Sequence, residues 1–152
     1  ARFNVPFLMI APRIQEKYGK ISNTVGTQLD VIPTILGRLG GVSRHQCWGR
    51  DLLNLPKADR GFGVIKPSGN DQTVAIISDD KIVVQSKSKS LKTYEYQLWA
   101  DPRGIELKSE PQEEELKRKL DAFIQIATRS LMANTTGLYK TSSKTPPSRS
   151  AQ

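Results

Sequence analysis

The chain has very few of the residues that make cross-links and metal sites, because its 152 residues include one cysteine and one histidine. The lone Cys47 cannot form an internal disulfide, so nothing firm follows about the redox compartment. Cys47 lies close to His45 in the sequence, but a structural zinc site takes about four ligands. We therefore interpret Cys47 as a packed or loop thiol.

Long hydrophobic runs are also missing. The longest apolar stretch, residues 5–11, is far shorter than the roughly 18–20 apolar residues of a membrane-spanning helix. No signal peptide precedes it, and the chain begins with Ala1, from which we expect a protein whose front has been trimmed. With 37% hydrophobic and 25% charged residues, the composition is that of an ordinary soluble domain with a core of its own.

Acidic residues are outnumbered, since 15 Asp and Glu face 23 Lys and Arg, for a net charge of +8. Such a balance fits binding to nucleic acid, binding to anionic lipid, or simple solubility. No basic patch has aromatic residues interleaved for base stacking, so we expect no nucleic-acid partner. A small basic binding domain for nucleic acid or anionic lipid is the alternative function, supported by the lysine-rich loop of residues 86–92.

The first third of the chain has the pattern of an α/β core. Residues 5–11 are apolar without alternation, which is typical of an inner strand of a parallel sheet, and its partner strands would precede it. A polar stretch, residues 13–24, indicates a loop. A short covering helix is then predicted, with Asp30 as N-cap, Pro33 in the first turn and Gly40, with its neighbour Gly41, at the C-terminal cap.

The rest of the chain predicts an antiparallel sheet, a closing helix and a tail. The predicted strands are residues 62–66, 73–78, 81–85 and 93–99. Asp101 and Pro102 begin a predicted turn. Ser109 and Gln112 fit a capping box for the closing helix. Its apolar stripe consists of Leu116, Leu120, Phe123, Ile124, Ala127 and Leu131. Residues 140–152 are predicted to be disordered or extended.

The order of these segments carries a resemblance to a known family. The segments are VPFLMIAP, GTQLDVIPTILGRLGG and GRDLL in the first third, and a later stretch with Tyr96, Leu98, Asp101-Pro102 and Leu107. This order resembles the C-terminal part of sulfatase-like domains of the alkaline-phosphatase superfamily. It is most similar to the branch of the lipoteichoic acid synthases and phosphoglycerol transferases.

The resemblance implies a fold class and a division of the chain. The fold would be α/β: the C-terminal portion of an alkaline-phosphatase-like α/β sandwich, with one parallel-sheet strand, a covering helix, a small antiparallel sheet and a closing helix. Residues 1–60 would end the α/β core. Residues 61–139 would form the antiparallel subdomain with the closing helix, followed by the tail.

The resemblance also implies the chemistry of a parent enzyme. In this family a Thr, Ser or modified Cys attacks phosphorus or sulfur, and divalent cations stabilise the developing charge. The nucleophile and metal ligands lie upstream of the part that this chain resembles, so no catalytic or metal residue is carried over. We expect the chain alone to be inactive and to hold no cofactor, while the parent would use Mn, Mg, Ca or Zn.

The function that follows is structural. The chain would complete a metal-dependent phospho- or sulfo-ester hydrolase, or a phosphoglycerol or phosphoethanolamine transferase. Its partner would be the upstream catalytic half, in the same protein or as a separate chain, and the isolated fragment would pair with a second copy. The resemblance implies a parent in the bacterial cytoplasmic membrane with its catalytic domain outside the cytoplasm.

Two arginines are candidates for the substrate cleft of such a parent. Arg13 directly follows the predicted strand, where ligands bind in open α/β sheets, and it either contacts an anionic head group or is a solvated loop residue. Arg50, beside Asp51, either binds phosphate or forms a local ion pair. Trp48 and Trp99 are either sugar-stacking platforms or packing residues.

Overall fold

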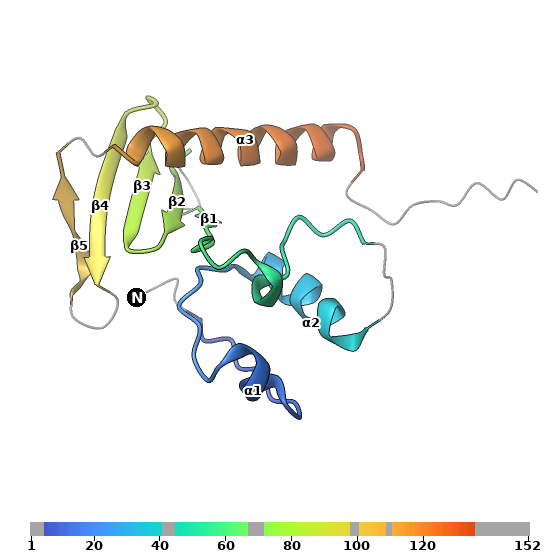
Figure 1. Ribbon diagram of the computed structural model, residues 1–152. Coiled ribbons are helices and arrows are strands. Elements are labelled where there is room, and N and C mark those ends of the chain that lie inside the picture. Colours follow the sequence, from blue (N-terminus) through green and yellow to red (C-terminus); the bar gives the residue numbers. More distant parts are fainter. Residues whose placement is uncertain (1–4, 41–44, 67–71, 98–100, 109–110, 136–152) are drawn as a thin grey trace, which may run out of the picture.

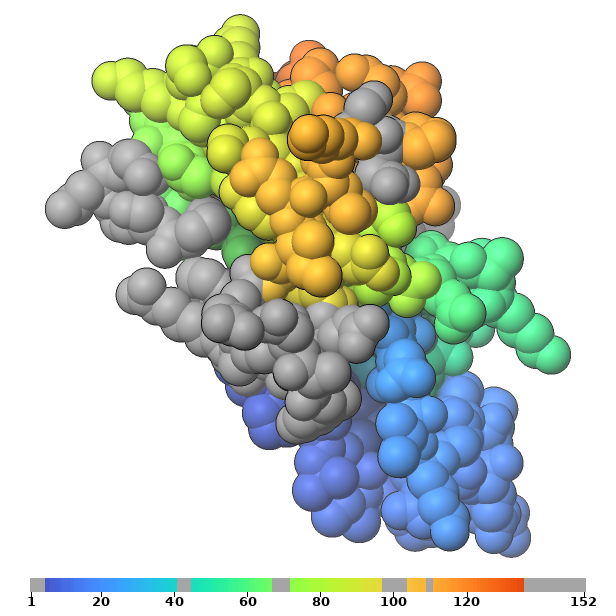
Figure 2. Space-filling view, turned by 90° about the vertical axis from the view of Figure 1, so that its left-hand side faces the viewer, coloured from blue at the N-terminus to red at the C-terminus, as the bar shows by residue number. Residues whose placement is uncertain are grey.

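A computed structural model describes residues 5–40, 45–66, 72–97, 101–108 and 111–135, and in residues 97 and 101–103 it describes the backbone alone. It shows a mixed α/β chain with one five-stranded sheet in the order β1-β2-β3-β4-β5, in which every pairing is antiparallel. A long helix, α3 (Glu113–Met132), lies across one face of the sheet, and α1 (Ile14–Tyr18) and α2 (Val31–Leu39) lie beyond the end of β1 (Figure 1). In Figure 2 the segments that contain α1 and α2 form a blue lobe beside the sheet.

The core lies between α3 and the sheet. Because side chains alternate along each strand, one row of the register faces the helix, namely Val64, Ile76, Val83, Thr93 and Leu107. Ile76, Val83 and Leu120 are completely buried there, and Leu116 is 5% exposed. The apolar stripe of α3 therefore forms the core with the middle strands β2 (Val74–Ser78) and β3 (Lys81–Gln85).

Four strands lie where strands were predicted: β1 (Gly63–Ile65), β2, β3 and β4 (Leu91–Gln97). The fifth, β5 (Asp101–Leu107), was predicted as a turn that begins at Asp101 and Pro102, and that prediction is wrong. β5 is the outer edge strand, where a proline costs no hydrogen bond of the sheet interior. Trp99 lies outside the described residues.

The closing helix lies where its apolar stripe predicts it, but its start differs. Gln112 is the N-cap and makes no side-chain capping bond, while Ser109 of the predicted capping box lies outside the described residues, as does the predicted tail. Within α3, Glu115 and Lys119 form an ion pair at 2.8 Å. Glu113 accepts from the hydroxyl of buried Thr93, which ties the first turn of α3 to β4. Among the described residues no helix is long and apolar enough to cross a membrane.

Residues 5–11 do not form the predicted strand. Within the described part of the chain, residues 5–10 have no backbone hydrogen-bond partner, and Leu8 and Ile10 are 80% and 79% exposed. A strand exists only through its neighbours, and no described strand lies beside these residues. The polar stretch that follows was predicted as a loop, but it contains the short helix α1.

The helix α2 leaves much of its apolar surface uncovered. Pro33 lies in its first turn and is buried, and Gly40 follows its last residue with φ 77° and ψ 171°, a conformation that essentially only glycine adopts. Gly41 lies outside the described residues. Ile32, Ile35 and Leu39 are nevertheless 57%, 41% and 75% exposed. The described residues therefore cover α2 only in part, on the side of Pro33 and Thr34.

Candidate functional site

The most connected polar group of the chain is the carboxylate of Asp30, which is 2% exposed. It accepts from the backbone N–H of Thr27 at 2.7 Å and from the Thr27 hydroxyl at 3.1 Å. The two residues form a capping box at the start of a short 3₁₀ helix (Gln28–Asp30) that leads directly into α2. Asp30 occupies the N-cap position of α2, as predicted, but its side chain makes no capping bond to that helix and takes part instead in the capping box of Thr27.

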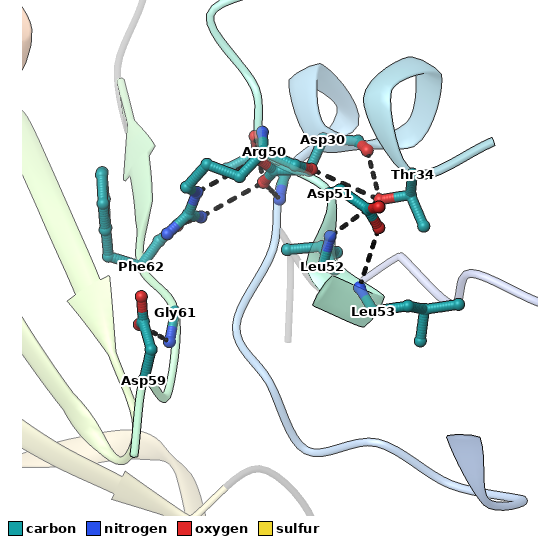
Figure 3. A network of polar contacts seen from close by, with 10 residues as sticks. Asp30, Thr34, Arg50, Asp51, Leu52, Leu53, Asp59, Gly61 and Phe62 are labelled. Atoms are coloured by element: carbon teal, nitrogen blue, oxygen red, sulfur yellow. Dashed lines mark hydrogen bonds and ion pairs between the residues drawn. The ribbon is translucent and has the colours of Figure 1, made fainter. Parts of the chain in front are cut away.

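Arg50 lies between Asp30 and Phe62 (Figure 3). Its backbone N–H donates to Asp30 Oδ1 at 2.7 Å, and its Nε lies 3.3 Å from the same oxygen. Its Nη2 donates to the backbone carbonyl of Phe62 at 2.6 Å, and the guanidinium lies 4.1 Å from the centre of the Phe62 ring. Arg50 thereby connects the entry to α2 with the residue that precedes β1.

A second ion pair holds the same segment against α2. Arg38 Nη2 lies 2.6 Å from Asp51 Oδ2, and the Arg38 guanidinium stacks on the Tyr18 ring of α1 at 4.7 Å. A side chain at Gly37 would meet the Asp51 carboxylate at 2.2 Å, so this approach requires glycine there. Asp51 also caps a short 3₁₀ helix (Leu52–Asn54) by accepting from the Leu53 N–H at 3.2 Å.

Thr34 completes the network from the helix side. Its buried hydroxyl donates to the Asp30 carbonyl at 2.6 Å and accepts from the Leu52 N–H at 3.0 Å (Figure 3). Helix α2 and residues 50–52 are therefore joined by two ion pairs and a shared hydroxyl. We refer to Asp30, Thr34, Arg38, Arg50 and Asp51 as the Asp30 network.

A small cavity lies next to this network, between it and α3. Its volume is about 20 Å³, and Asp30, Arg50, Phe62, Trp48 and Phe123 are among its lining residues. Trp48 and Phe123 meet edge to face, with ring centres 6.3 Å apart. A space of this size fits roughly one water molecule, far less than a substrate. The geometry is that of a packing contact between the segment around α2 and the part of the chain that contains the sheet and α3.

Burial alone raises the pKa of Asp30, but hydrogen bonds from Arg50 and Thr27 outweigh it and hold that pKa below its ordinary value of 3.8. A carboxyl group with a lowered pKa in the folded state contributes stability above the unfolded pKa and loses it as the pH falls through the folded pKa.

We therefore predict that the free energy of unfolding decreases as the pH falls below about 4. In the variant Asp30→Asn this decrease at low pH should be smaller. Urea unfolding over a pH series for both proteins measures it; identical pH profiles would contradict the assignment.

The other sequence candidates are not gathered at one place. Arg13 is exposed and lies directly before α1, where its φ is 61°. No contact between Arg13 and Arg50 is found among the described residues. Arg50, the second cleft candidate, forms an ion pair, but its partner is Asp30, 20 residues earlier in the sequence, and not a local residue. Trp48 is 36% exposed and packs on Phe123. Within the described residues, no group of three or more His, Cys, Asp or Glu side chains is placed to hold a metal ion.

The sequence contains a signal for the capping box of Thr27 and Asp30. The prediction of Asp30 as N-cap overlooked this signal. Thr27 and Asp30 stand three residues apart before an apolar run, the spacing of a capping box. The pair Arg38–Asp51 has no such local signal, because its members come from separate elements. Comparisons with known proteins give no match: no protein-family model, no curated protein and no solved structure matches this chain.

Proposed function

We propose that this chain is the C-terminal structural portion of a metal-dependent phospho- or sulfo-ester hydrolase, or of a phosphoglycerol or phosphoethanolamine transferase. The nucleophile and the divalent metal ion belong to an upstream part with which this chain packs. The proposal rests on the resemblance of the segment order and on one structural observation, the uncovered apolar surface of the first third.

That surface has two components. Residues 5–10 offer apolar side chains together with backbone N–H and C=O groups that have no backbone partner among the described residues, a combination that an additional strand satisfies and a helix does not. Helix α2 offers Ile32, Ile35 and Leu39, all more than two-fifths exposed. Strand partners and a sheet face that covers α2 are what the rear part of an α/β core needs from the preceding sequence.

The charge of +8 is weaker support for the alternative basic binding domain. In the lysine-rich hairpin, Lys92 pairs with Glu106 at 3.1 Å and Lys81 lies 3.7 Å from Asp80. Lys87 and Lys89 are exposed at the tip. Two such lysines fall short of the cluster of about four to eight basic residues that is typical of anionic-lipid binding.

The test compares this chain with a longer protein that includes the coding sequence upstream of Ala1. We predict that the longer protein turns over an aryl phosphate, an aryl sulfate or a lipid phosphoglycerol donor when Mn²⁺, Mg²⁺, Ca²⁺ or Zn²⁺ is supplied. The 152-residue chain should show no turnover under the same conditions. Metal-dependent activity of the 152-residue chain that survives repurification would contradict the proposal.

A substitution separates packing from activity. Ile35→Asp should cost little in the 152-residue chain, where Ile35 is 41% exposed, but about 2 kcal/mol or more in the longer protein, where a covering sheet would bury the charge. Ile21→Asp is the matched control, because Ile21 is 84% exposed and lies outside α2. Equal effects of Ile35→Asp in the two proteins, measured by thermal unfolding, would contradict the proposed packing.

A further inference from the structure

The guanidinium of Arg50 has one nitrogen that the Asp30 network leaves without a partner. Its Nε and Nη2 face the Asp30 carboxylate at 3.3 Å and 3.4 Å, and Nη2 also donates to the Phe62 carbonyl at 2.6 Å. Nη1 is buried and has no hydrogen-bond partner among the described residues. A buried charged donor is costly without an acceptor, so in folded proteins such an atom normally bonds to an ordered water or an ion.

The cavity of about 20 Å³ beside the network supplies room for such a partner. Arg50, Asp30 and Phe62 line it, together with Thr27 and Gly49. Its remaining lining residues are Leu29, Trp48, Val64 and Phe123. A cavity holds a water molecule when its volume exceeds roughly 10–15 Å³ and two to four polar groups are within reach. The volume therefore suits one water molecule and excludes a larger ligand.

Polar groups of both kinds lie around this space (Figure 3). Both N–H groups of Arg50 Nη1 are donors without an acceptor among the described residues. The Phe62 carbonyl accepts from Nη2, and a carbonyl oxygen has a second lone pair. The Thr27 hydroxyl donates to Asp30 Oδ2 at 3.1 Å, and its oxygen has two lone pairs, of which the capping box uses one. A single water accepts from Nη1 and donates to these oxygens.

Charge selects a neutral ligand. The Asp30 carboxylate repels an anion and the Arg50 guanidinium repels a cation, and the two side chains form an ion pair whose charges cancel. An apolar molecule would leave Nη1 without an acceptor. Water is the neutral molecule that both accepts and donates and that fits the volume.

Arg38 shows that an unpaired nitrogen alone does not define such a site. Its Nε and Nη1 are also buried and have no hydrogen-bond partner among the described residues. Arg38 does not line this cavity, and its guanidinium stacks on the Tyr18 ring at 4.7 Å. Arg50 stacks on Phe62 as well, but it combines the unpaired nitrogen with an adjacent polar cavity.

We propose that one internal water molecule is bound between Arg50 Nη1 and the Phe62 carbonyl, as a fixed part of the contact between the segment around α2 and the sheet. The water supplies the hydrogen bond that the guanidinium lacks. Trp48 and Phe123 line the same cavity, so we expect slow exchange with bulk water. This proposal does not depend on the proposed enzymatic function.

A high-resolution crystal structure of the 152-residue chain tests the site directly. We expect electron density for a water at about 2.7–3.2 Å from Arg50 Nη1. Crystals grown with bromide in place of chloride distinguish an ion from water, because bromide gives an anomalous signal. In solution, oxygen-17 magnetic relaxation dispersion counts long-lived waters. Arg50→Lys keeps a positive charge for Asp30 but loses the guanidinium, so its dispersion amplitude should fall by one water molecule.

Arg38→Lys is the matched control, because it changes the other ion-paired arginine and should leave the number of long-lived waters unchanged. Urea unfolding verifies that both variants are folded, and the crystal structure of the unsubstituted chain decides the question if Arg50→Lys does not fold. A cavity without electron density, an anomalous peak in bromide, or an equal change in the two variants would each overturn the proposal.

Discussion

Replacement of Asp30 by alanine should lower the free energy of unfolding by about 3–5 kcal/mol. The carboxylate is 2% exposed, and among the described residues it is the only ion-pair partner of Arg50. Its removal leaves a largely buried guanidinium without its counter-ion and the backbone N–H groups of Thr27 and Arg50 without their acceptor. Urea unfolding followed by circular dichroism measures the loss.

A surface ion pair is the matched control. Glu115 and Lys119 lie at 2.8 Å, but the two side chains are 59% and 44% exposed, so Glu115→Ala should change stability by at most about 1 kcal/mol. A double-mutant cycle of Asp30→Ala with Arg50→Ala then isolates the coupling between those two side chains. Equal losses for Asp30→Ala and Glu115→Ala would contradict the central role of the Asp30 network. Stabilisation by divalent ions that disappears in Asp30→Ala would instead identify Asp30 as a metal ligand.

The size of this effect depends on contacts that are distant in the sequence. As a simple helix cap, Asp30 would contribute about 0.5–2 kcal/mol. Its pairing with Arg50 spans 20 residues, and the contact of Arg50 with the Phe62 carbonyl spans 12. Local patterns indicate that Asp30 begins a helix, but nothing in the residues around it indicates which arginine will pair with it.

Elements with a strong local period were predictable. Helix α3 has an unbroken apolar stripe and an acidic first turn, and β2 and β3 are short runs rich in Val and Ile that are separated by Asp79-Asp80. Both signals are present within a few residues of the element itself. The edge strand β5 was missed because Pro102 and Gly104 are turn residues by composition, and pairing with β4 decides their conformation.

The apolar segment of residues 5–11 shows the opposite case. Its composition predicts a buried strand, yet in the structure it has no strand partner among the described residues. Composition reports what a segment would bury, and pairing depends on which other strands are available.

Leu120→Ala should lower the free energy of unfolding by about 2–5 kcal/mol. Leu120 is completely buried between α3 and the sheet, in contact with the cluster of Ile76, Val83 and Leu116. Alanine is the best helix former, so the substitution leaves the intrinsic preference for α3 intact, and the cost reports the lost packing and the cavity left behind.

The same helix supplies the control for that packing. Leu131 lies about three turns after Leu120 but is 64% exposed, because α3 packs on β2 and β3 with its first half and extends past them (Figure 1). Leu131→Ala should therefore change stability by less than about 0.5 kcal/mol. Chemical denaturation of both variants compares the two sites directly. Similar losses at both positions would mean that the second half of α3 is also buried, and that the core extends beyond the sheet that now defines it.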